Sequence, residues 1–280
     1  MATNVQTSPQ AADFNIRKLN QAQFDRAKWY WGLAQFLKLI SLVLGTATVV
    51  WAPSPWYVPI LVFAVFVLAE SAATFSDRVR SKAESLLRRL DYRDLLGWPI
   101  DATELATTLA EAPDSQLQPL TGAEEEYFAT QEQVPAVRTL QGIKESAWWS
   151  ARQAKIMAIL CSVVTFTLVS ISLGILLVAI NLIQEPQQGE QFARLATSLL
   201  MVIFSLSIYR LILGYYNFST SADRIVSRAT TLLSQGNDDQ LEAAKLLAEY
   251  HVFRAVSPPL STLLWKVKRK KYNSIWRRTP

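Results

Sequence analysis

Three charged side chains fall inside long apolar stretches of this sequence, where an ion is costly. Lys38 lies 16 residues before Ser54, and Glu70 lies 16 residues after it. If a turn at Ser54 joins two antiparallel helices, both side chains lie at the same depth, roughly 24 Å below the turn. We predict that they form an ion pair that sets the register of the hairpin. The alternatives are that they line a water-filled path, or that Lys38 alone snorkels.

Arg210 is the third charge in an apolar stretch. It lies about 27 Å from the outer end of its predicted helix, and no acidic residue in its own hairpin matches its depth. Its guanidinium is expected to snorkel to lipid phosphates, to approach Glu70, or to line a pore. Lys38, Glu70 and Arg210 are therefore the candidate intramembrane or pore residues.

The C-terminus combines basic and aromatic residues. Such a segment suits anionic lipid headgroups, at about 1 kcal/mol for each basic residue near the membrane surface. It also suits a phosphate-bearing ligand, because bases stack on aromatic rings and cations bind phosphates. Lipid is the favoured interpretation. The candidate residues are Lys266, Arg269, Lys270, Tyr272 and Trp276.

The composition places these charges in a membrane protein. Half of the residues are apolar and only 18% are charged, whereas about a quarter are charged in a typical soluble domain. No charged side chain occurs in residues 39–69 or 156–183. Because about 20 apolar residues cross the hydrocarbon core as a helix, these stretches predict membrane spans.

The two apolar blocks predict four spans in two hairpins. Residues 33–75 are long enough for two crossings joined by a turn at Pro53-Ser54-Pro55, because proline interrupts the helical hydrogen-bond ladder. The polar run Gln184–Gln191 joins a third span, about 156–183, to a fourth, about 193–216. The spans contain no helix broken by glycine or proline, the usual mark of a transporter substrate site.

The basic residues predict the orientation. Four Lys and Arg residues precede the first span, ten lie in residues 76–155 and eleven lie in residues 217–280, whereas the two hairpin turns contain none. Positive charge is retained on the cytoplasmic side. Both termini and the middle segment are therefore expected in the cytoplasm.

The segments that follow the two hairpins are similar. Residues 77–87 align without gaps on residues 223–233, with six of eleven positions identical. Both segments carry an apolar stripe at helical spacing, which predicts amphipathic helices. We interpret this as a tandem repeat, although shared juxtamembrane composition is an alternative. The basic residues Arg78, Arg224 and Arg228 of these helices are further candidates for binding a ligand or lipid phosphate.

The predicted fold is an all-α membrane protein with four transmembrane helices as two hairpins in a tandem repeat, with cytoplasmic helical extensions. Asp101 and Glu104 predict a capped helix in the middle segment. The predicted organisation is a cytoplasmic approach helix (1–32), hairpin 1 (33–75), a cytoplasmic helical segment (76–155) with an acidic connector (113–135), hairpin 2 (156–216) and a cytoplasmic helical and polybasic tail (217–280).

Motifs for catalysis and cofactor binding are missing from the sequence. We find no phosphate-binding glycine loop, nucleophile elbow or zinc motif. The chain has one cysteine, Cys161, and one histidine, His251, which we expect to be a surface or packing residue. We therefore expect no enzyme activity, no cofactor and no metal site.

Three stretches resemble a known family, the four-transmembrane effectors associated with bacterial nucleotidyltransferases of cyclic-oligonucleotide antiphage signalling. Phe24-Asp25-Arg26-Ala27-Lys28 resembles the family's approach to the first span. Lys82–Asp91 stands in the place of its Ala-rich helix, although Arg88-Arg89 replaces a Gln-Glu pair. The segment from Phe253-Arg254 through Pro258-Pro259 to Trp265-Lys266 and Arg269 resembles its closing text.

The resemblance implies a pore-forming effector of antiviral defence by abortive infection. A cyclic oligonucleotide would bind the cytoplasmic part of a homo-oligomer, which would then permeabilise the bacterial inner membrane. The expected partners are the lipid bilayer and the nucleotide messenger, with no DNA or RNA. The alternatives are a non-enzymatic membrane scaffold that docks a cytoplasmic partner and a small transporter.

Overall fold

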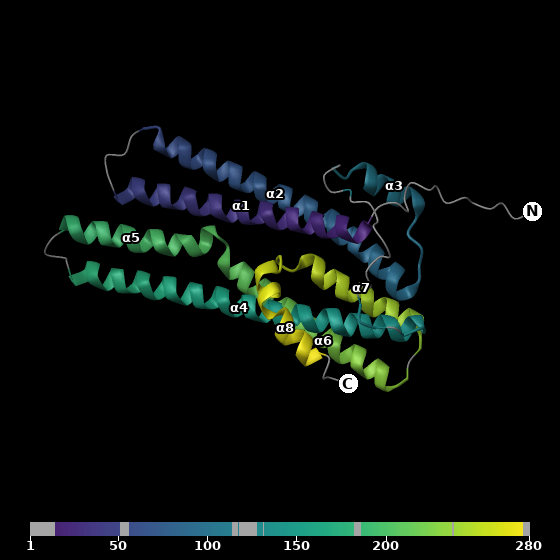
Figure 1. Cartoon of the computed structure of the whole chain (residues 1–280). Coiled ribbons are helices and arrows are strands. Elements are labelled where there is room, and N and C mark those ends of the chain that lie inside the picture. The colour runs from purple at the N-terminus through teal and green to yellow at the C-terminus, as the bar shows by residue number, and fades with distance from the viewer. Residues whose placement is uncertain are drawn as a thin grey trace, which may run out of the picture. The chain divides into compact units, whose positions relative to one another are not determined.

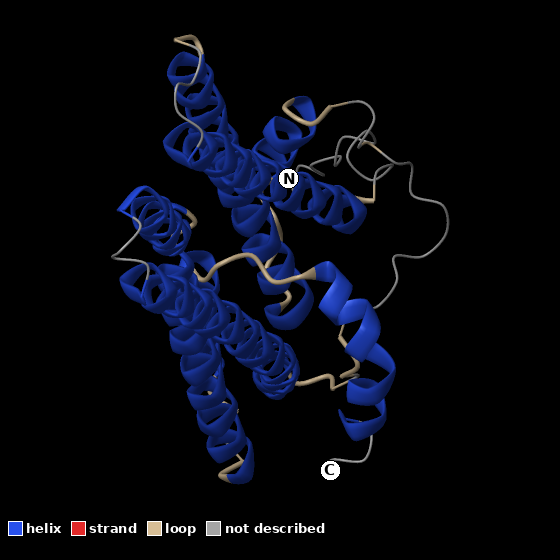
Figure 2. Cartoon of the chain, turned by 90° about the vertical axis from the view of Figure 1, so that its left-hand side faces the viewer, coloured by secondary structure: helices blue, strands red, loops and turns tan. Residues whose placement is uncertain are grey.

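The computed structural model describes residues 15–50, 56–113, 117, 128–130, 132–181, 186–236 and 238–276. These residues form helices with short connections and no strand (Figure 2), which confirms the all-helical class. Three parts of the sequence lie outside the described residues: the turn predicted at Pro53-Ser54-Pro55, most of the connector 113–135, and the basic residues Arg277 and Arg278 near the C-terminus. The helices are α1 (Ile16–Val50), α2 (Val58–Asp91), the π-helix η2 (Tyr92–Leu96), α3 (Ala102–Ala110), α4 (Pro135–Asn181), α5 (Pro186–Ser205), α6 (Ile208–Ser234), α7 (Gln240–Val256) and α8 (Thr262–Trp276).

Among the described residues, three helices are long and apolar enough to cross a membrane. They lie within α1, α2 and α4, and only 11% of the most apolar stretch of each is buried inside the chain. An apolar helix that the chain itself leaves uncovered is suited to lipid rather than to a soluble core. The large side chains left exposed on these stretches include Phe63 (68%), Phe166 (74%) and Leu177 (63%). Three of the described helices are thus suited in length and composition to cross a membrane.

The predicted fourth span is interrupted. Helix α5 ends at Ser205 and α6 begins at Ile208. Between them Ser207 has a φ of 51°, a left-handed conformation that side chains other than glycine adopt at a cost. The prediction of one continuous helix over 193–216 is therefore wrong. The sequence carries no warning of this break, because neither glycine nor proline occurs at it.

The chain divides into two compact units. The first comprises Met1–Ala27, Asp77–Trp148 and Ala222–Ala255, and the second comprises Lys28–Ser76, Trp149–Ser221 and Val256–Pro280. The predicted tail segment 217–280 is therefore shared between them. The second unit contains α1 from Lys28 onward and α2 up to Ser76, together with α5 and α8.

In the second unit, α1 and α2 form the predicted helical hairpin (Figure 1). Their close approach occurs at small residues. Ser41 Oγ donates a hydrogen bond of 3.2 Å to the carbonyl of Val62, and a Cβ added at Gly45 would lie 3.9 Å from the Val62 side chain. By contrast, a Cβ at Gly174 of α4 would meet nothing within 4 Å. Gly45 therefore lies at a helix contact, whereas Gly174 does not.

The first unit has a conventional buried core. The apolar stripe predicted on α2 is buried at Ala83, Leu86, Leu87 and Leu90, which confirms its orientation. Asp101 caps α3 as predicted, because its carboxylate accepts the backbone N–H groups of Thr103 and Glu104. The other buried side chains of this core come from several helices and include Leu19, Leu95, Leu140, Ile143, Ile225, Leu246 and Leu247.

Candidate functional site

The two charges predicted to meet in the first hairpin do so. Lys38 Nζ lies 2.7 Å from Glu70 Oε1, which confirms the predicted ion pair. The lysine side chain is 13% exposed, whereas the glutamate side chain is 50% exposed. Thus most of the lysine side chain is covered, and half of the glutamate side chain is left uncovered on an apolar helix.

Arg210 stands in the first turn of α6, directly after the interruption at Ser207. It is exposed, and among the described residues it has no ion-pair partner. The Ser207 carbonyl accepts the N–H of Leu211 at 3.1 Å, so the new helix begins within one residue of the break. The guanidinium is therefore placed beside a helix end and not in the middle of a regular span.

The basic candidates on the repeated helices differ in their surroundings. Arg78 on α2 and Arg224 on α6 are exposed, whereas Arg228 forms an ion pair with Glu249 of α7. The repeat is therefore helical at both copies, but the basic residues of its two copies have different surroundings.

The C-terminal candidates separate into two groups on α8. Tyr272 packs against Trp149 of α4, with ring centroids 5.3 Å apart. The Arg269 guanidinium lies 4.7 Å from the centroid of the Trp265 ring. Lys266 and Lys270 are exposed, and Trp276 is partly buried. Some of the residues predicted to bind a ligand or lipid are thus used in packing.

The connection to α8 is held tightly to α6. The Tyr215 hydroxyl donates a hydrogen bond of 2.8 Å to the Pro259 carbonyl, and a Cβ at Gly214 would lie 2.7 Å from Pro258 Cγ. Because a proline ring is rigid, the glycine is required for this contact. Lys28 of α1 also donates to Thr262, the first residue of α8, at 2.8 Å.

We expect Gly214→Ala to lower the free energy of unfolding by about 1–3 kcal/mol, because the new methyl group displaces Pro258. The matched control is Gly32→Ala, where a Cβ would meet nothing within 4 Å. This control should gain about 0.5–1 kcal/mol from its better helix propensity. Thermal unfolding in detergent, followed by tryptophan fluorescence, measures both. A gain of stability in both variants would contradict the tight contact.

The first unit contains a buried polar cluster that the sequence did not predict. Asp91 and His251 are 4% and 5% exposed, and His251 Nε2 lies 3.4 Å from Asp91 Oδ2. Arg17 lies 3.7 Å from the other oxygen of Asp91 and also pairs with Asp94. Both ring nitrogens of His251 and Oδ1 of Asp91 lack a hydrogen-bond partner. Apart from the ion pair between Arg17 and Asp94, the cluster is held by packing more than by hydrogen bonds.

Burial changes the titration of both groups in opposite directions. It raises the pKa of Asp91 to about 7, although the Arg17 and Arg254 charges oppose the rise. Burial, followed by the Arg254 and Arg88 charges, lowers the pKa of His251 to about 3. Both effects favour the neutral form of a group removed from water. The pair is therefore an uncharged acid beside an uncharged imidazole over most of the acidic range.

His251 was expected to be a surface or packing residue, and its packing role is confirmed. Its contact with Asp91 was missed because the two residues are far apart in the sequence. A signal was present, since Asp91 follows Leu87 by four residues and so continues the buried stripe of α2. Neither group is accessible enough to act on a substrate in this conformation.

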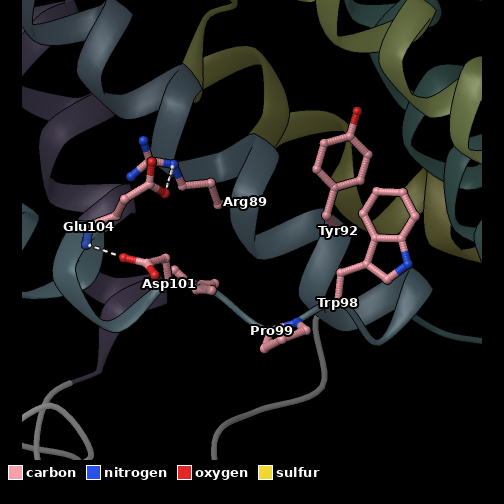
Figure 3. A pocket seen from close by; sticks show the side chains of 7 residues that line it. Arg89, Tyr92, Trp98, Pro99, Asp101 and Glu104 are labelled. Atoms are coloured by element: carbon pink, nitrogen blue, oxygen red, sulfur yellow. Dashed lines mark hydrogen bonds and ion pairs between the residues drawn. The ribbon is translucent and has the colours of Figure 1, made fainter.

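A cleft of about 390 Å³ lies beside this cluster in the first unit. Tyr92 and Trp98 form one side of it, with ring centroids 5.5 Å apart (Figure 3). Arg89 pairs with Glu104 at 3.2 Å across it. The lining contains two carboxylates, Asp101 and Glu104, and one cation, Arg89. This balance of charge does not favour a phosphate ligand.

Comparison of the chain with protein-family models, with curated proteins and with solved structures gives no match.

Proposed function

We propose that the protein self-associates in a membrane and opens a permeation path, as a membrane-disrupting effector triggered by a cyclic oligonucleotide. The observation that carries this proposal is the Glu70 side chain, which is half exposed on an apolar helix. In a single chain this carboxylate would face lipid. A second copy of the chain, or water in a path between copies, would cover it.

A charged side chain at the centre of the hydrocarbon costs about 2.5–3.5 kcal/mol, even on the lower of the available scales, and Glu70, roughly 24 Å below the turn, bears a smaller cost nearer the cytoplasmic interface. Lys38 offsets part of this cost but leaves half of the Glu70 side chain uncovered. Four helices from one chain enclose little space. A path through the membrane is therefore expected to require a homo-oligomer.

The interruption before Arg210 supports the same proposal. Irregular backbone is tolerated at membrane depth where it is buried in protein or lines a water-filled cavity. Here the left-handed Ser207 and the exposed Arg210 occur together. Both are suited to a wet surface, and both are unsuited to contact with lipid chains. We propose that Glu70 and Arg210 line the path.

The nucleotide trigger and the antiphage setting rest on the sequence resemblance described above. In this proposal the protein resides in the bacterial inner membrane with both termini in the cytoplasm, so that a messenger made inside the cell reaches its first unit. The ligand must bind the open assembly more tightly than the closed one, since binding shifts an equilibrium only through such a difference.

The test is dye release from proteoliposomes that contain the protein, with and without a panel of cyclic di- and trinucleotides. We expect release with at least one nucleotide, and a several-fold slower release from Glu70→Gln/Arg210→Gln. The matched control is Glu190→Gln/Arg194→Gln, which removes an exposed pair of the same types on α5. This control should release dye as the wild type does.

Three outcomes would contradict the proposal or part of it. The absence of release across the whole panel would favour a membrane scaffold, which predicts a stable complex with a cytoplasmic partner and no conductance. Equal release with and without nucleotide would remove the trigger. Equal losses in the two double variants would remove the assignment of Glu70 and Arg210 to the path.

A small transporter is the second candidate, and the interruption at Ser207 favours it. Discontinuous helices often form the substrate sites of transporters, because their half-helix ends face the membrane interior. A transporter would take up one class of solute in a saturable way without releasing dye. Saturable uptake measured in the same vesicles separates the two functions.

A further inference from the structure

We propose that α8 is an interfacial helix that docks on an anionic phospholipid surface through one of its two faces. This inference does not depend on the pore proposed above. The docking face has Leu263 and Val267 at its centre and is flanked by Lys266, Lys270 and Lys271. A charged lipid headgroup layer over a hydrocarbon layer is the surface that such a face matches.

Helical periodicity separates the two faces of α8. Leu263 and Val267 are four residues apart, so they lie on one side of the helix. Trp265 and Tyr272 are seven residues apart and lie together on the opposite side. The basic residues are divided unequally between the two sides. Three lysines, Lys266, Lys270 and Lys271, border the side that contains Leu263 and Val267. Sequence composition alone does not reveal this division.

The aromatic face is directed to the rest of the second unit. Tyr272 packs against Trp149 of α4, and Arg269 lies over Trp265 on the same helix. The contact between Tyr272 and Trp149 orients α8 about its own axis. The opposite face is consequently directed away from α4.

That opposite face is uncovered. Leu263 and Val267 are 75% and 74% exposed, and all three flanking lysines are exposed. These two neighbouring aliphatic side chains are therefore not packed against the described part of the chain. Lysine side chains at the borders can extend their ammonium groups to phosphates while their methylenes follow the apolar side chains into the interface.

The start of α8 is fixed where the apolar helices end. The hydrogen bond from Tyr215 to Pro259 ties it to α6, at the end of the predicted fourth span. The hydrogen bond from Lys28 to Thr262 ties it to α1, before the predicted first span. Figures 1 and 2 both show α8 running across the direction of α4 and not along it. With α4 spanning the bilayer, α8 lies along the membrane surface.

Lipid is a better occupant than a soluble phosphate ligand. A soluble phosphate is bound by donors that converge on one point, as in a pocket or a nest. The three lysines instead diverge along the convex side of one helix and enclose an apolar strip. In an anionic bilayer, separate headgroups can each bind one lysine, and the acyl chains beneath them accept the two aliphatic side chains.

The experiment uses the full chain with Cys161→Ser and a single new thiol, Val267→Cys, labelled with an environment-sensitive fluorophore. The protein is reconstituted into phosphatidylcholine vesicles with increasing fractions of phosphatidylglycerol, in which some lipids carry brominated acyl chains. We expect a blue shift and quenching that grow with the anionic fraction. A label at Ser234, exposed in the first unit, should show neither.

The charge requirement is tested with matched double variants. Lys266→Gln/Lys270→Gln removes two charges from the docking face, and each removal should lower the ratio of docked to free helix about fivefold. Lys268→Gln/Arg269→Gln removes the same number of charges from the same helix, mostly on the other face. The first variant should need a larger anionic fraction for half-maximal quenching, and the second should not.

Three results would overturn the inference. The first is no quenching of the Val267 label at any anionic fraction. The second is equal quenching in pure phosphatidylcholine, which would show burial without charge recognition. The third is reversal of the blue shift by millimolar inorganic phosphate at constant ionic strength, which would identify a soluble phosphate site. Equal shifts from the two double variants would likewise count against this face.

Discussion

Lys38→Ala is expected to lower the free energy of unfolding by about 3 kcal/mol. The variant leaves Glu70 without the cation that lies 2.7 Å away, within a long apolar helix. Removal of one partner from a covered ion pair costs about 3–5 kcal/mol, because a charge is left uncompensated. The lower end applies here, since half of the Glu70 side chain is exposed. Thermal unfolding of the protein in lipid nanodiscs measures the loss.

Two double variants distinguish the effect of the ion pair from the effect of each single charge. Lys38→Ala/Glu70→Ala removes both charges and should recover most of the stability, because the remaining surface is apolar. Lys38→Glu/Glu70→Lys keeps an ion pair at the same depth, so its free energy of unfolding should also exceed that of Lys38→Ala. If Lys38→Ala alone is as stable as the wild type, the carboxylate is compensated from elsewhere and the pair does not set the hairpin.

The pH dependence of stability is the second large effect, and it is expected to be hidden in the wild type. The pKa of Asp91 rises from 3.8 to about 7, so the fold retains a proton that the unfolded chain releases. Stability from this group therefore falls as pH rises from about 4 to 7. The pKa of His251 falls from 6.5 to about 3, so the unfolded chain binds a proton that the fold excludes. Stability from this group rises over about pH 3 to 6.5.

The two slopes cancel between about pH 4 and 6.5, and single substitutions should reveal them. Relative to the wild type, Asp91→Asn should become more stable as pH rises, by up to about 1.4 kcal/mol for each pH unit. His251→Gln should show the opposite slope over the same range. Denaturant unfolding in detergent at a series of pH values, with each variant compared with the wild type, measures both.

Asp238→Asn is the control for these curves. Asp238 is exposed, so its substitution removes a carboxylate without touching the buried pair. Slopes of the same sign in Asp91→Asn and His251→Gln would contradict the assignment of neutral forms to both groups. The absence of either slope would mean that water reaches the cluster in solution.

The sequence by itself determined the features that depend on position along a single helix or hairpin. Lys38 and Glu70 are equally far from one turn, so any antiparallel hairpin brings them together. The stripe from Ala83 to Leu90 repeats at helical spacing and therefore had to face a core. The Asp101 cap depends only on the backbone of the next three residues.

Only the tertiary structure decided the features that join distant segments. Asp91 and His251 are brought together by the packing of two helices separated by most of the chain. The face of α8 available to lipid depends on Tyr272 packing against Trp149, a contact with no local signal. The break at Ser207 also lacks one, since neither glycine nor proline marks it. Local periodicity specifies which face of a helix is apolar, whereas the partner of that face follows from packing in three dimensions.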